Sequence, residues 1–68
     1  MIKEKRKSKN YTQEQMSEIL NISLRQYVRI DNEEDLPRRD ILRNIVKILE
    51  LTDEEIGTYI RSMINKAS

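Results

Sequence analysis

Three side chains that can form paired hydrogen bonds lie within five residues of one another, at Arg25, Gln26 and Arg29. An arginine guanidinium can donate two parallel hydrogen bonds to the edge of guanine, and a glutamine amide can pair in the same way with adenine. Leu24, directly before them, is an apolar side chain of the kind that contacts the methyl group of thymine. The segment therefore offers recognition of base edges, provided that a rigid element presents these side chains together.

Catalytic chemistry has few possible carriers in this chain. The sequence contains no His and no Cys, which removes the commonest general base, the commonest transition-metal ligand and any thiolate nucleophile. The adjacent acids at 33–34 and 53–54 are explained more simply by solvation than by a catalytic pair. We therefore predict no enzymatic activity, no catalytic residue, no metal site and no cofactor.

The composition indicates one small helical domain over residues 1–68. Hydrophobic residues make up 37% of the chain and charged residues another 37%, with a formal net charge of +1. Eighteen of the 68 residues are Ile, Leu or Val, which is enough for collapse around a core. One Gly and one Pro leave little of the turn chemistry that β-hairpins need. Because no apolar run is as long as a membrane span and no signal peptide is evident, we expect a cytoplasmic protein with no membrane partner.

Apolar residues recur at helical spacing in four segments, and a fifth, at residues 2–9, is weak by pattern because Ile2 is its only apolar residue, so the sequence predicts an all-α fold of five helices. The expected helices cover about residues 2–9, 12–20, 23–30, 37–49 and 52–66. Pro37 suits the first turn of the fourth helix. Capping boxes are predicted at Thr12 and Thr52, each followed three residues later by Gln or Glu, and Ser23 is the expected N-cap of the third helix.

The second and third expected helices are joined by only Asn21 and Ile22. This link is too short for the two helices to pack side by side in antiparallel fashion. Asn is also one of the few residues besides Gly that tolerate the left-handed conformation at a helix end. The link has the right length for a helix-turn-helix over about residues 12–31, whose second helix points outward and fits the major groove of DNA.

The sequence resembles the phage Cro/cI-type helix-turn-helix family, also called the Xre family. The resemblance runs from Arg6 through TQEQMSEILNIS and YVRIDN to Pro37 and residues 49–52. It implies a five-helix, lambda-repressor-like DNA-binding domain whose third helix is the recognition helix. It also implies an ion pair between Arg6 and Asp31 that ties the first helix to the end of the third. If exposed, such a pair adds only ~0–1 kcal/mol.

The residues expected to touch DNA come from this resemblance and from the charge pattern. The resemblance implies base or phosphate contacts along the recognition helix and a phosphate contact at the start of the second helix. Three arginines near the start of the fourth helix have the wrong sign for the helix dipole, which favours a phosphate-facing role. The full set is Gln13, Ser23, Leu24, Arg25, Gln26, Arg29, Arg38, Arg39 and Arg43.

The chain departs from the family pattern at three places. Asn21 stands where Gly is frequent. Ser17 stands where Ala is usual, and its hydroxyl must bond back to its own helix. The residues after Ile30 are acidic, and segment 31–35 carries a charge of −4 in what we expect to be a loop. Acids there repel phosphate. The basic segment 1–9 either binds phosphate or is a solvated tail.

The last expected helix carries more apolar residues than a domain of this size needs. Ile60, Met63 and Ile64 continue its apolar stripe and require a cover, either the first helix or a second copy of the chain. Family members generally bind two half-sites as a two-fold dimer. We therefore expect a homodimer with its contact at these three residues.

Two functions remain open from the sequence. The first is a sequence-specific regulator of transcription that binds double-stranded DNA, of the kind used by phages and mobile elements, for example as a repressor. The second is a protein-interaction module of the same fold, an antirepressor or corepressor whose partner is another regulatory protein. The acidic loop and the near-neutral net charge favour the second.

Overall fold

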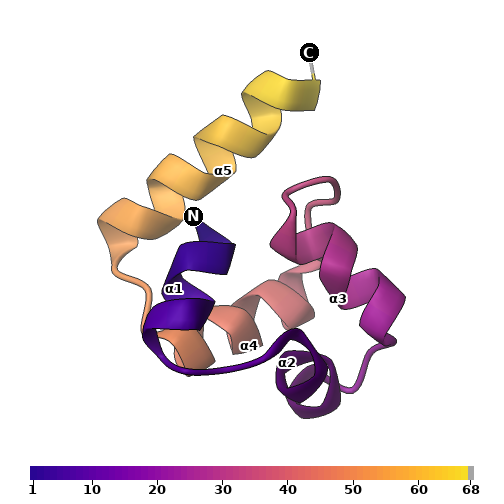
Figure 1. Ribbon diagram of the computed structural model, residues 1–68. Coiled ribbons are helices and arrows are strands. Elements are labelled where there is room, and N and C mark those ends of the chain that lie inside the picture. The colour runs from indigo at the N-terminus through magenta and orange to yellow at the C-terminus, as the bar shows by residue number, and fades with distance from the viewer. Residues whose placement is uncertain (68) are drawn as a thin grey trace.

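The structure, a computed structural model that describes residues 1–67, consists of five α-helices (Figure 1). They are α1 (Ile2–Ser8), α2 (Gln13–Leu20), α3 (Leu24–Asp31), α4 (Arg39–Leu49) and α5 (Asp53–Ala67). The described residues contain no strand, and the predicted all-α, five-helix fold is confirmed.

Side chains at the helix starts form the caps that the sequence predicts. The hydroxyl of Thr12 accepts the backbone N–H of Gln15 at 3.0 Å, and the Gln15 side chain accepts the backbone N–H of Thr12 at 2.8 Å. Thr52 and Glu55 make the same reciprocal pair at the start of α5. Ser23 caps α3 by accepting the N–H of Gln26 at 3.0 Å. Each cap satisfies backbone donors that a helix start leaves without a partner.

The link between α2 and α3 is the predicted tight turn. Asn21 lies in the left-handed region at φ 57° and ψ 45°, and the next residue, Ile22, donates its N–H to the carbonyl of Ser17 at 3.0 Å. The Ser17 hydroxyl donates to the carbonyl of Glu14 at 2.7 Å, as its buried position requires. The two short helices therefore meet at a fixed angle, with α3 turned away from the chain that precedes it.

The predicted start of α4 is wrong. Pro37 is buried and precedes the helix, which begins at Arg39 after an extended N-cap residue, Arg38. The proline ring packs in the interior instead of occupying the first helical turn. Arg38 has no oxygen in its side chain with which to accept a backbone N–H, and it makes no capping hydrogen bond.

The core forms where α2 packs on α3 and α4, and α1 packs on α3. Figure 1 shows α5 running past the N-terminal end of α1, with the loop between α3 and α4 facing the far half of α5. The largest fully buried hydrophobic side chains come from all five helices: Ile2, Met16, Tyr27, Ile30, Ile45, Leu49 and Tyr59. This arrangement holds α3 at one side of the domain.

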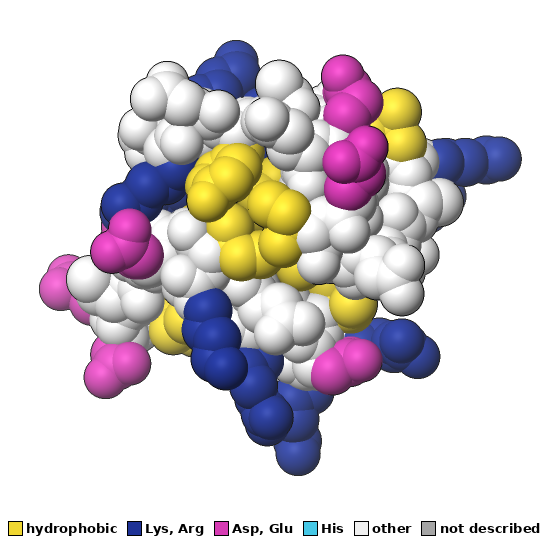
Figure 2. All heavy atoms as spheres, turned by 90° about the horizontal axis from the view of Figure 1, so that it is seen from below, with side chains coloured by type: hydrophobic (Ala, Val, Ile, Leu, Met, Phe, Trp, Pro, Cys, Tyr) yellow, Lys and Arg dark blue, Asp and Glu magenta, His cyan; other side chains and the backbone are white. Residues whose placement is uncertain are grey.

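Some apolar side chains remain at the surface. Ile19 of α2 is exposed, whereas Met16 and Leu20 of the same helix are buried. Met16 and Leu20 are one turn apart and share the buried stripe, whereas Ile19 is rotated from Leu20 by about 100° and falls outside it. Figure 2 shows the molecule from below, at the end where α2 and α4 lie. On this face, hydrophobic side chains form a patch with charged side chains around it.

Candidate nucleic-acid interface

The outer face of α3 carries the side chains that the sequence singled out for base recognition. Leu24, Arg25 and Gln26 occupy its first turn and are exposed. Arg29 lies one turn further on the same face as Arg25, and its side chain is 50% exposed. Tyr27, on the opposite side of the helix, is fully buried. One short helix therefore presents all four of these side chains outward.

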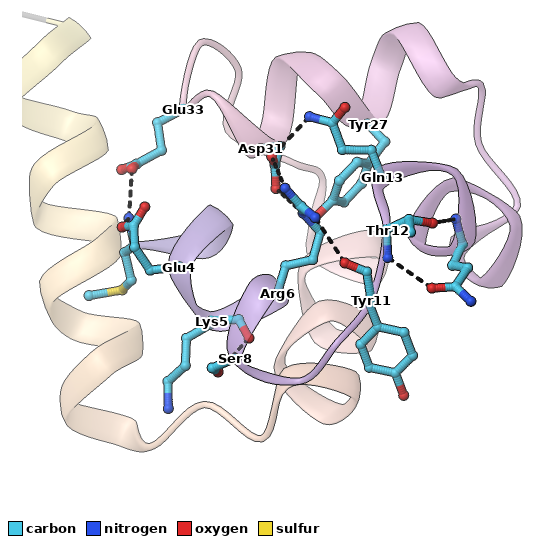
Figure 3. A network of polar contacts seen from close by, with 12 residues as sticks. Glu4, Lys5, Arg6, Ser8, Tyr11, Thr12, Gln13, Tyr27, Asp31 and Glu33 are labelled. Carbon is cyan, nitrogen blue, oxygen red and sulfur yellow. Dashed lines mark hydrogen bonds and ion pairs between the residues drawn. The ribbon is translucent and has the colours of Figure 1, made fainter.

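A buried polar network anchors the inner side of α3 (Figure 3). Asp31 accepts four hydrogen bonds: from Arg6 Nε at 3.0 Å and Nη2 at 3.1 Å, from the Tyr27 hydroxyl at 2.9 Å, and from Gln13 Nε2 at 3.1 Å. Arg6 Nη1 donates to the backbone carbonyl of Tyr11 at 2.8 Å. The network joins α1, the segment before α2, the first residue of α2 and the end of α3, so it sets the orientation of the helix-turn-helix.

The expected pair of Arg6 and Asp31 is present, and it is buried. Arg6 is 7% exposed and Asp31 is 0% exposed. Burial by itself raises the pKa of Asp31, but the hydrogen bonds donated by Arg6, Gln13 and Tyr27 outweigh it and lower that pKa below its ordinary value. Burial and the neighbouring Asp31 raise the pKa of the Tyr27 hydroxyl. Removing one partner of this pair would therefore leave the other buried without compensation, which costs more than breaking a surface ion pair.

Gln13 takes part in this network. Its amide nitrogen is bound to Asp31 within the protein, and the side chain is half-buried. The amide therefore has a fixed orientation at the first residue of α2. A phosphate contact by Gln13 stays a prediction.

The acidic segment 31–35 differs from the solvated loop that the sequence predicts. Asp31 is the last residue of α3 and is buried against Arg6. Glu33 Oε2 accepts a hydrogen bond from the N-terminal ammonium of Met1 at 2.9 Å. Asp35 forms an ion pair with Arg29 at 2.8 Å. Three of the four carboxylates are thus paired with cations of the same chain, which reduces the repulsion of phosphate expected from this segment.

Of the two expectations for the basic segment 1–9, the solvated tail is wrong because residues 2–8 form α1, and a phosphate contact stays a prediction. Lys5 pairs with Glu55 at 2.9 Å, and Lys9 pairs with Glu50 at 2.7 Å. These contacts, together with the buried Arg6, attach α1 to the rest of the domain. The segment is an ordered helix whose cations are largely used inside the chain.

The arginines near the start of α4 lie on the surface. Arg38, Arg39 and Arg43 are all exposed, and Arg38 Nη2 lies 3.8 Å from a carboxylate oxygen of Asp40. Arg38 and Arg39 stand at the end of the helix where backbone N–H groups point outward. This end of α4 thus combines two cations with backbone donors.

The apolar stripe of α5 divides between the core and the surface. Met63 is 7% exposed and belongs to the core, so the expectation that it forms an intermolecular contact is corrected: the chain itself covers it. Ile60 is half-buried against the core. Ile64 is 57% exposed. Only the outer part of the predicted stripe is therefore available to a partner.

Ile64 also lines a groove of 230 Å³ between α5 and the loop that follows α3. The other lining residues include Leu36, Glu33 and Glu34. Sequence reasoning missed the exposed Leu36, and it also missed the pairing of Asp35 with Arg29. Both features depend on how the loop lies against the helices. Neither the periodicity of apolar residues nor a cap motif predicts the path of a loop.

Neither a membrane segment nor a metal site is found among residues 1–67. No helix there has the length and apolar character needed to cross a bilayer. No three His, Cys, Asp or Glu side chains in this part of the chain come together in a way that could hold a metal ion.

Two short capped helices, α2 and α3, are joined by a left-handed turn at Asn21, and α3 faces outward. These features define a helix-turn-helix domain. A family model described as Helix-turn-helix, of the Cro/cI-type and Xre-like class, matches residues 2–56. The chain belongs to this family, whose members are DNA-binding regulators and are generally not enzymes. No curated protein and no solved structure matches the chain.

Proposed function

We propose that this protein is a sequence-specific transcription regulator that inserts α3 into the major groove of double-stranded DNA. The observation that carries the proposal is the outer face of α3, where Leu24, Arg25, Gln26 and Arg29 are exposed on a helix anchored from behind by the Asp31 network. Regulation follows from occlusion or recruitment at a promoter. Its setting in a phage or mobile element rests on the sequence resemblance.

Phosphate contacts supply the affinity in this proposal. The exposed Arg38 and Arg39 at the start of α4, with Arg43 one turn further, suit a phosphate group, because backbone N–H groups and the helix dipole also favour an anion there. Gln13 and Ser23, at the starts of α2 and α3, complete the set. Because such contacts release counterions, we expect affinity to fall steeply as salt increases.

The test is selection of binding sites from a random DNA pool, followed by affinity measurements on the selected site. We expect Arg25→Ala to weaken binding by ~1–3 kcal/mol and to relax the preference at particular bases. Arg61→Ala, which removes an exposed arginine from α5, is the matched control and leaves the base preference unchanged. Uniform weakening of all sequences by Arg25→Ala would mean that this residue only holds the backbone.

We further propose that the protein binds DNA as a homodimer through α5, with Ile64 and the outer side of Ile60 in the contact. An exposed apolar side chain beside a groove supports this assignment, and two-fold dimers match two half-sites one DNA turn apart. Sedimentation tests it. Ile64→Glu is expected to give a monomer, whereas Ile19→Glu, at an equally exposed isoleucine of α2, leaves the dimer intact. A dimeric mass for Ile64→Glu would refute the contact.

The groove beside α5 also favours a second function, a protein-interaction module acting on another regulator. Leu36 and Ile64 are exposed there beside Glu33 and Glu34, a combination of apolar and acidic groups that suits a protein better than DNA. A mobility-shift experiment with random duplex at low salt separates the two functions. A DNA reader shows at least weak nonspecific binding, whereas a module that acts only on proteins shows none.

A further inference from the structure

The ion pair between Arg29 and Asp35 has a specific geometry. Arg29 Nε donates to Asp35 Oδ2 at 2.8 Å, and Nη2 donates to Oδ1 at 3.4 Å. The loop is also attached to Arg29 by its backbone, since the N–H of Glu34 donates to the Arg29 carbonyl at 2.8 Å and that of Asp35 at 3.4 Å. The carboxylate is therefore held beside the guanidinium by the path of the main chain.

A guanidinium has two edges that can each donate a pair of parallel hydrogen bonds. In Arg29 the edge formed by Nε and Nη2 faces Asp35. The edge formed by Nη1 and Nη2 remains for an external acceptor. A side chain held at one edge also loses fewer rotamers when the other edge binds, so less conformational entropy is lost in recognition.

The charge of the Arg29–Asp35 pair indicates which kind of acceptor binds the remaining edge of Arg29. Asp35 compensates the positive charge of Arg29, so the pair attracts a phosphate only weakly. The direction of the remaining N–H groups is unaffected, and O6 and N7 of guanine form an uncharged double acceptor of matching width in the major groove. A positioned, charge-compensated arginine therefore suits a base edge better than the DNA backbone.

We propose that Asp35 is a positioning residue that makes Arg29 a reader of guanine. The proposal rests on the proposed function, because it requires α3 to lie in the major groove. It assigns to the acidic loop a part in specificity, where the sequence suggested only repulsion of phosphate.

The experiment compares site selection by the wild type, Asp35→Ala, Glu34→Ala and Arg29→Ala, after circular dichroism shows that each is helical. Glu34→Ala is the matched control, because it removes the same charge from the same loop at a side chain that lines the α5 groove. We expect the wild type to prefer guanine at one position of each half-site about 5- to 150-fold. Arg29→Ala loses that preference, Asp35→Ala loses most of it, and Glu34→Ala retains it.

Other outcomes overturn the proposal in distinguishable ways. If Asp35→Ala binds all sequences more tightly and keeps the guanine preference, Asp35 only masks Arg29 from phosphate. If Arg29→Ala removes a guanine preference and Asp35→Ala does not, Arg29 reads the base without help and only this inference fails. If the wild type selects no sequence at all, the proposed function fails together with it.

Discussion

Helix α3 carries an arginine–aspartate pair on each side, and the two pairs differ mainly in burial. On the inner side, Asp31 is 0% exposed and accepts four hydrogen bonds, two of them from Arg6. On the outer side, the side chains of Arg29 and Asp35 are 50% and 48% exposed. The same two functional groups thus meet once in the interior and once in water.

The difference shows how burial assigns a role to an ion pair. An interior pair whose carboxylate is fully bonded cannot lose one partner without leaving a charge in a low-dielectric environment. A surface pair is screened by water and salt, so the loss of one partner leaves the other solvated and costs little stability. We therefore expect the Arg6–Asp31 pair to control folding and the Arg29–Asp35 pair to control recognition.

The largest expected effect is on the buried pair. Arg6→Ala leaves the Asp31 carboxylate buried without its main partner, and we expect a loss of ~3–5 kcal/mol in the free energy of unfolding. In a domain of 68 residues this loss is enough to leave much of the population unfolded at 25 °C. Urea denaturation followed by circular dichroism measures it. A loss below 1 kcal/mol would contradict the comparison, because Arg6 would then behave as a surface residue.

Acid should destabilise the inner side of α3. Because the folded pKa of Asp31 lies below its ordinary value of 3.8, its contribution to stability is present above about pH 4 and is lost as the pH falls through the folded pKa. We expect the free energy of unfolding to decrease below pH 4, and the Asp31 carboxyl to titrate below 3.8 in a ¹³C NMR titration. A midpoint above 3.8 would mean that burial outweighs the hydrogen bonds.

The two buried tyrosines extend the comparison to neutral groups. The Tyr27 hydroxyl donates to Asp31, and Tyr27→Phe should lower the free energy of unfolding by ~1.5–3 kcal/mol, as for a hydrogen bond to a charged group. The buried Tyr59 hydroxyl has no hydrogen-bond partner among the residues that the structure describes, and burial raises its pKa to about 12. Tyr59→Phe is therefore the matched control, and we expect it to be neutral or slightly stabilising. Equal losses from both variants would show that the two hydroxyls are equally bonded in solution.

The smallest expected effect is the change in protein stability when the exposed pair is removed. Arg29→Ala and Asp35→Ala should each change the free energy of unfolding by less than about 1 kcal/mol, because both side chains lie in water. The same urea denaturation serves as the measurement, with Arg6→Ala as the reference for a pair of the same chemistry. A loss of several kcal/mol from Asp35→Ala would place this pair in the same class as the buried one and would remove the contrast.

Features that depend on neighbours in sequence could be predicted. The caps at Thr12, Ser23 and Thr52 and the left-handed turn at Asn21 each involve residues within five positions of one another. The period of apolar residues likewise predicts the helices after the first, and it places Tyr27 inward with Leu24, Arg25, Gln26 and Arg29 outward. The bond of the Ser17 hydroxyl to its own helix follows from the same local geometry.

Features that depend on segments distant in sequence could not be predicted from local pattern. The ion pair of Arg6 with Asp31 spans 25 residues and was expected only from the family resemblance, and its burial depends on how α1 covers the end of α3. Met63 looks like Ile64 in the helical pattern, yet one lies in the core and the other on the surface, because the domain covers only part of the α5 stripe. Pro37 packs inside instead of starting α4 for the same kind of reason.

The amino-acid sequence by itself determined the helices, their caps, the tight turn and the residue types on the outer face of α3, because backbone hydrogen bonding and side-chain periodicity act over three or four residues. Tertiary structure alone decided which carboxylates are buried and which remain in water, and it formed the pairs of Glu33 and Asp35 that the sequence did not indicate. The burial and pairing of a carboxylate depend on the positions of whole helices and of the loop after α3. The electrostatic energy of a charge in turn depends on how much water and protein surround it.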